Sequence, residues 1–148
     1  MGPFETLDAL NAALDRLRVA PAPTIAGAWT SAQVLEHCAQ SIDCQMKGFP
    51  AMKPAVVRAT VGRVVLGVFL ARGRMSHDRV AQVPGLEAPV NRPWAEAVDR
   101  LAASVRALQG WQTELAPHAV FGAMSKARGE RYHAIHVSDH LRDWPAPR

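Results

Sequence analysis

The sequence predicts an all-helical protein: an antiparallel four-helix bundle with an additional apolar helix in the middle of the chain and long loops. Two observations lead to this fold class. Four segments repeat apolar residues at intervals of three and four, as one face of a helix does, and no series of alternating residues predicts a sheet. With 148 residues, 49% of them hydrophobic and 20% charged, the chain fits one domain over residues 1–148.

The first two helices are expected in the N-terminal third of the chain. The first covers residues 6–17, with Thr6 as its N-cap, and a segment rich in proline from 19 to 27 follows as a surface linker. The second begins at Thr30, which can also cap, and ends at Gly48 and Pro50. Its apolar stripe consists of Val34, Leu35, Cys38, Ile42 and Met46.

The central segment 54–72 is a nearly continuous apolar run that is rich in β-branched residues. Its length favours a buried helix over a strand, although Gly62 and Gly67 weaken a helical assignment. Residues 73–92 then form a long loop, and loops of this length often border a functional site.

Two more helices are expected in the C-terminal half. One runs from Pro93 to Gly110, with apolar residues at helical spacing, and the other from Ser125, a plausible cap, to about residue 144. The last helix contains half of the six histidines, at intervals of i, i+3 and i+7: His133, His136 and His140. At about 100° per residue, the three rings fall within a sector of roughly 60°.

These histidines suggest a metal site. Neutral imidazole is a ligand for zinc, nickel, copper and iron. His37 lies beside the apolar stripe of the second helix, with Ser41 and Cys44 following on the same face. If the two helices pack together, His37 completes a three-histidine site that leaves coordination positions for water or substrate. The alternative is that the histidines are structural and bond to neighbouring polar groups.

Several short motifs resemble those of a known family. They are Trp29-Thr30, the run from Val34 to Ile42 (VLEHCAQSI), Phe121-Gly122, and His136-x-x-x-His140. In this order and spacing they resemble the DinB-like superfamily, including its uncharacterised bacterial subgroup, over nearly the whole chain. The resemblance implies a four-helix bundle that holds a divalent metal, commonly zinc or nickel, on His37, His136 and His140. His133 would then be a neighbour or an alternative ligand, and Ser41 and Cys44 further neighbours.

The resemblance also frames the expected activity. Some relatives of this kind are thiol-dependent transferases or isomerases that use a low-molecular-weight thiol, and others have no known activity. A bound cation favours thiolate over thiol, but it also lowers the pKa of water, so the residues do not choose between a transferase and a hydrolase. The competing hypothesis is a non-catalytic bundle in which the histidines bind a small anion or are structural. Such a bundle could form a homodimer.

The charge of the chain makes an anionic partner plausible, and the expected partner is a small-molecule substrate. The formal net charge is +4, and the central segment carries a basic tract: Arg58, Arg63, Arg72, Arg74 and Arg79. Of these, Arg58, Arg63 and Arg74 are candidates to bind an anionic substrate such as a thiol that carries carboxylates, although surface charge is the simpler explanation. The tract lacks interleaved aromatic residues, so no nucleic-acid partner is expected.

The chain also gives expectations about its location. Cys38 and Cys44 lie almost two turns apart in one predicted helix, too far apart to form a disulfide, which suggests reduced thiols and a cytoplasmic protein. The first 14 residues lack the basic cluster and apolar run of a signal peptide. No apolar stretch reaches the roughly 20 residues of a spanning helix, so no membrane partner is expected.

Overall fold

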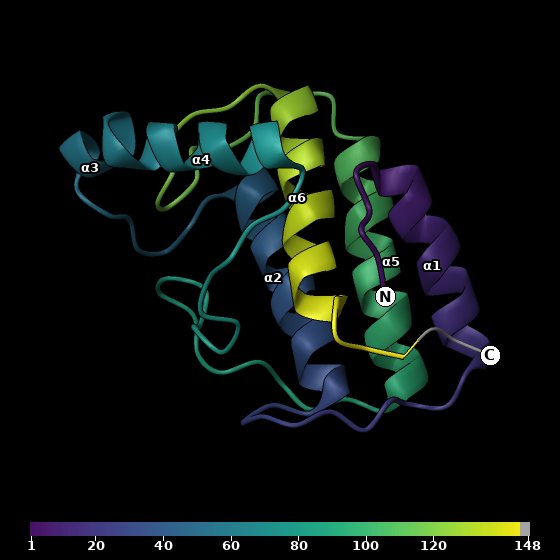
Figure 1. Ribbon diagram of the computed structural model, residues 1–148. Helices are drawn as coiled ribbons and strands as arrows, with labels where there is room; N and C mark the ends of the chain where they lie inside the picture. The colour runs from purple at the N-terminus through teal and green to yellow at the C-terminus, as the bar shows by residue number, and fades with distance from the viewer. Residues whose placement is uncertain (146–148) are drawn as a thin grey trace.

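The computed structural model describes residues 1–145, and over that range the chain is helical and contains no strand (Figure 1). Four long helices lie side by side, and two shorter helices form an arm that projects from them. The long helices are α1 (Leu7–Val19), α2 (Ser31–Lys47), α5 (Trp94–Gln109) and α6 (Lys126–Leu141). The arm consists of α3 (Ala55–Ala59) and α4 (Val61–Arg72).

The helix starts predicted from the sequence are confirmed. The side chains of Thr6, Thr30 and Ser125 each accept the backbone N–H three residues later, which would otherwise lack a partner at the start of a helix. At Thr30 the arrangement is a full capping box, because the Gln33 side chain accepts the backbone N–H of Thr30 in return. Gly48 ends α2 with a positive φ of 107°, a conformation that glycine adopts without strain.

The core of the protein lies between the four long helices. Its fully buried side chains are mostly leucines, isoleucine and valines at helical spacing: Leu10, Leu14, Leu35, Ile42, Leu101, Val105 and Leu108. Burying one such side chain contributes about 1.5–3 kcal/mol. This core fixes α2 and α6 relative to each other, and the candidate site is built between these two helices.

The expectation of an antiparallel bundle holds only for some helix pairs. Glu36 of α2 pairs with Arg92, which lies just before α5, and further along both helices Asp43 pairs with Arg100, so these two helices run in the same direction. Figure 1 shows α1 and α6 running the opposite way. The reason is the long connection between α2 and α5, which carries the arm and a loop, and returns the chain to the end where α2 began.

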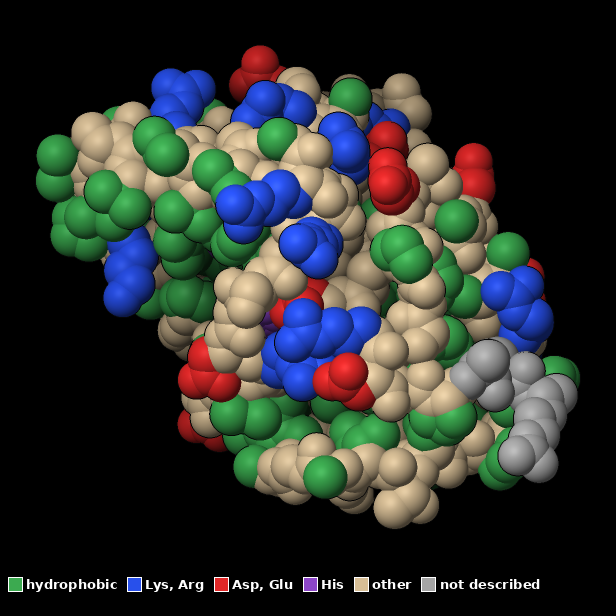
Figure 2. All heavy atoms as spheres, viewed as in Figure 1, with side chains coloured by type: hydrophobic (Ala, Val, Ile, Leu, Met, Phe, Trp, Pro, Cys, Tyr) green, Lys and Arg blue, Asp and Glu red, His purple; other side chains and the backbone are tan. Residues whose placement is uncertain are grey.

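The central apolar segment is helical, but the prediction that it is buried is wrong. It breaks at Thr60 into α3 and α4, and of its residues only Gly62, Leu66 and Leu70 are buried. Leu66 and Leu70 pack with Phe121, Met124, Tyr132 and Ile135 in a small second core. Four valines of the arm are exposed instead: Val56, Val61, Val64 and Val68. In Figure 2 the arm shows hydrophobic side chains with cationic side chains between them.

Within the described residues, none of the helices combines the length and the apolar character that crossing a bilayer requires.

Candidate metal centre

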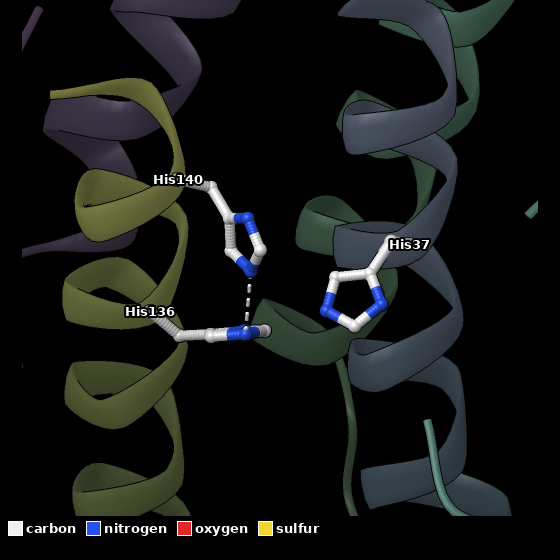
Figure 3. Close-up of side chains that lie close together, drawn as sticks. All are labelled: His37, His136 and His140. Carbon is white, nitrogen blue, oxygen red and sulfur yellow. Dashed lines mark hydrogen bonds between the residues drawn. The ribbon is translucent and has the colours of Figure 1, made fainter. Parts of the chain in front are cut away.

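The structure brings His37, His136 and His140 together between α2 and α6 (Figure 3). All three side chains are buried, and one potential ligand atom from each lies within 4.8 Å of the other two. The Nε2 atoms of His136 and His140 are 3.2 Å apart. Very little histidine surface is visible on the face drawn in Figure 2. The three rings therefore point into a shared interior space, and two of them come from one helix and one from another.

The helix geometry and neighbouring aromatic rings hold these side chains in place. His136 and His140 are four residues apart, so they lie one turn apart on the same face of α6. The ring of Tyr132, one turn earlier, is stacked almost parallel to that of His136, with centroids 5.7 Å apart. The Trp29 indole, just before α2, lies 5.2 Å from the ring of His37. Restricted rings lose less freedom when they bind a ligand.

Burial keeps all three imidazoles neutral at physiological pH. It lowers the pKa of His37 to about 4 and that of His140 to about 2. The pKa of His136 also falls well below 6.5, because the ring is buried and other imidazoles surround it. Neutral imidazole carries a lone pair on one nitrogen, which is the form that binds metals.

A fourth histidine, His77, also lies at the site. It is carried by the loop between α4 and α5, and its Nε2 is 3.1 Å from the Nε2 of His140. The rings of His77 and His136 have centroids 5.1 Å apart. The sequence places His77 in a loop, where an isolated histidine usually has no function although it can overhang a site. The length of the loop that carries His77 was the feature that suggested that this segment borders a functional site.

The contacts around His140 cannot all be satisfied by hydrogen bonds. Each imidazole nitrogen has either one N–H or one lone pair in the plane of the ring. The Nε2 of His140 can therefore make one good hydrogen bond, yet it has two Nε2 neighbours, on His77 and His136. A cation among these nitrogens would accept a lone pair from each of them. The donor set thus fits a metal ion better than it fits a hydrogen-bonded network.

The remaining candidates from the two helices do not join this group of ligand atoms within the described residues. His133 is fully buried, its ring centroid is 6.3 Å from that of His136, and neither of its nitrogens has a hydrogen-bond partner in the described part of the chain. Ser41 and Cys44 are buried further along α2. Burial raises the pKa of the Cys44 thiol, and the neighbouring Asp43 raises it further, which disfavours a thiolate.

The other loop histidine, His118, has a structural environment. Its Nδ1 accepts the backbone N–H groups of Val120 and Phe121, and its ring stacks on that of Phe121. Burial lowers the pKa of His118 to about 3. These contacts fix the neutral ring in a tight turn that leads towards α6.

The predicted anion-binding arginines are not gathered at the histidines. Arg58 donates to the carbonyl of Lys53, Arg74 is exposed, and Arg63 lines a cavity elsewhere. The arginine next to the site is Arg79, which shares the loop with His77. Its guanidinium pairs with Asp143 at 2.8 Å.

Two cavities differ in their relation to the histidines. The larger, about 990 Å³, lies between α4 and the segment before α6, and none of the three histidines of Figure 3 lines it. The smaller, about 480 Å³, has His140 in its wall, together with Trp29, Val34, Arg79 and Trp144. The smaller cavity is therefore the one from which a small molecule could reach the histidines.

Residues 3–145 match the family described as "Protein of unknown function (DUF1569)". No curated protein and no solved structure matches the chain.

Proposed function

Because the chain belongs to the DUF1569 family, whose function is unknown, we propose its function from the site: it binds a divalent metal ion through His37, His136 and His140 and acts on a small molecule in the adjoining cavity. One observation carries this proposal. Three buried, neutral imidazoles from two helices have their ligand atoms within 4.8 Å of one another. Apolar packing alone gives no reason to gather polar rings in this way, since buried polar groups cost free energy when they lack partners.

The proposal extends to a fold of the DinB-like type, with zinc or nickel as the metal. The motifs that resemble this superfamily fall at the start of α2, in the turn before α6, and on α6 itself. Two of these motifs contain the three histidines, Trp29 lies beside the ring of His37, and Phe121 packs against Tyr132, which stacks on His136. Three nitrogen donors suit either metal, and they leave positions for water or substrate.

A bound divalent metal would supply a Lewis acid that favours thiolate over thiol and hydroxide over water. The protein contributes the shape and charge of the cavity. Trp29, Val34 and Trp144 present apolar surface that excludes water from one side. The Arg79 guanidinium lies at the wall, where it already pairs with Asp143, and its remaining N–H groups can donate to a carboxylate. We therefore propose transfer of a carboxylate-bearing low-molecular-weight thiol as the reaction, with hydrolysis as the alternative outcome of the test.

Metal analysis of protein purified without a histidine tag tests the site. We expect close to one equivalent of metal in the wild type and almost none in the His136→Ala, His140→Ala double variant. His118→Asn is the matched control, because it removes a buried histidine outside the group and should leave the metal content unchanged. A wild type that binds no added zinc, nickel or cobalt would contradict the proposal.

The reaction is tested with cobalt-substituted protein. A small thiol that binds the metal should change the cobalt absorption spectrum, and Arg79→Ala should weaken this binding for a carboxylate-bearing thiol more than for mercaptoethanol. If the thiols leave the spectrum unchanged while an activated ester is hydrolysed only by the metal-loaded protein, hydrolysis replaces thiol transfer.

A further inference from the structure

The loop histidine His77 is held in an orientation that metal-binding histidines commonly have. Its Nε2 faces the cluster, 3.1 Å from the Nε2 of His140, and its Nδ1 faces Asp139, 2.8 Å from the carboxylate Oδ2. The N–H of His77 is not aimed straight at this oxygen, so the contact is short but imperfectly aligned. With the proton on Nδ1, the lone pair of Nε2 is directed at the cluster.

We propose that His77 is a fourth protein ligand of the metal and that Asp139 is the residue that positions it. This proposal rests on the proposed metal site. It adds that the loop between α4 and α5 is part of the centre, so that metal binding fastens this loop to α6, and that a thiol or water would bind the ion at a fifth coordination position.

The distances around His140 support a shared ion. The Nε2 of His140 is 3.1 Å from that of His77 and 3.2 Å from that of His136. Four nitrogens bound tetrahedrally to zinc at 2.0–2.1 Å lie about 3.3 Å from one another. The two separations at His140 are close to this value, whereas the ligand atom of His37 lies within 4.8 Å of those of His136 and His140, so the rings would have to close around a common ion.

Asp139 offers His77 a neighbouring carboxylate, which His37 and His136 lack among the described residues. A histidine that binds a metal usually donates its other N–H to a carboxylate or carbonyl, which fixes the ring and increases its basicity. The Nδ1 atoms of His37 and His136 are buried and have no such partner within residues 1–145. The carboxylate of Asp139, itself almost fully buried, faces His77 instead.

Asp139 is also fixed in place, and the loop is held beside it. The Arg142 guanidinium donates to Asp139 at 2.9 Å. Two residues after His77, Arg79 pairs with Asp143 at 2.8 Å and donates to the backbone carbonyl of Asp139. The loop thus already lies against the C-terminal end of α6, and ligation by His77 would add a stronger link at the same place.

Cobalt binding and limited proteolysis test the proposal. We expect His77→Ala to weaken cobalt binding by at least about 100-fold and to change the absorption spectrum at saturation, because water replaces a nitrogen ligand. Asp139→Asn should weaken binding about tenfold, in the range for residues that support a ligand. Ser76→Ala, an exposed neighbour in the same loop, is the matched control and should behave as the wild type.

Trypsin provides a readout that does not depend on affinity. Saturating cobalt should slow cleavage after Arg74 and Arg79 in the wild type and in Ser76→Ala, but not in His77→Ala. His77→Gln, which keeps a polar side chain, should resemble His77→Ala if ligation is what fastens the loop.

The two proposals fail in different ways. His77 is not a ligand, although the three-histidine site stands, if the wild type and His77→Ala bind cobalt with the same affinity and spectrum and cobalt protects the loop equally in the two proteins. If the wild type binds no cobalt, the metal site itself is refuted.

Discussion

Metal binding should stabilise the folded protein, and the burial of the three histidines sets how this gain depends on pH. A ligand present at 100 times its Kd stabilises the native state by about 2.7 kcal/mol. For a domain of about 150 residues, each kcal/mol raises the Tm by roughly 2–4 °C. Zinc at this concentration should therefore raise the Tm by roughly 5–11 °C, and chelation with EDTA should reverse the rise.

The same gain is expected at pH 6 and at pH 7.5. The pKa of His37 is about 4, and those of His136 and His140 are lowered as well, so no proton has to leave these rings before metal binds in this range. An exposed histidine site, with a pKa near 6.5, would lose much of its affinity at pH 6.

Thermal unfolding with zinc or EDTA measures both effects, with the zinc concentration set from the Kd at pH 7.5 and kept the same at pH 6. His136→Ala, His140→Ala should show no rise, and His118→Asn should show the full rise. The reasoning is refuted if the double variant gains as much as the wild type, or if the wild-type gain disappears at pH 6.

Three further predictions concern the scaffold. His118→Asn keeps an acceptor for the turn but no longer titrates. Because the pKa of His118 is about 3 when folded and about 6.5 when unfolded, the stability of the wild type should fall as the pH drops through this range, and that of the variant should fall by about 1.4 kcal/mol per pH unit less. Urea titrations at several pH values measure the two slopes, and equal slopes would contradict the argument. Thr30→Ala removes the capping box and should cost about 1 kcal/mol by the same method, and an unchanged urea midpoint would contradict that role. Gly62→Ala places a Cβ 2.2 Å from the carbonyl oxygen of Val120 and should lower the Tm. Gly67→Ala on the same helix meets nothing within 4 Å and should stabilise the folded protein by up to about 1 kcal/mol. Equal effects of the two substitutions would refute the packing of α4.

Much of the helical structure followed from local signals in the sequence. The caps at Thr6, Thr30 and Ser125, and the end of α2 at Gly48, depend on bonds within a few residues of each other, so the residue types at these positions are enough to place them. The face shared by His136 and His140 is equally local, because helix geometry alone places residues i and i+4 one turn apart.

Local signals were not enough for the central segment. Its apolar composition predicted burial, but α4 contacts the rest of the protein mainly through Leu66 and Leu70, and its valines remain exposed. Composition measures the tendency of a segment to leave water. It does not measure how much surface the neighbouring elements offer to cover that segment.

The sequence by itself determined where the four long helices begin, that two histidines share one face of the last helix, and that His37 lies beside the apolar stripe of another helix. Only the tertiary structure decided that α2 and α5 run in the same direction, and that a loop brings His77 and Arg79 to the same place. The physical reason is range. Caps and helix faces depend on bonds and angles within one or two turns, whereas the position of a loop 60 residues away from α6 depends on how the whole core packs.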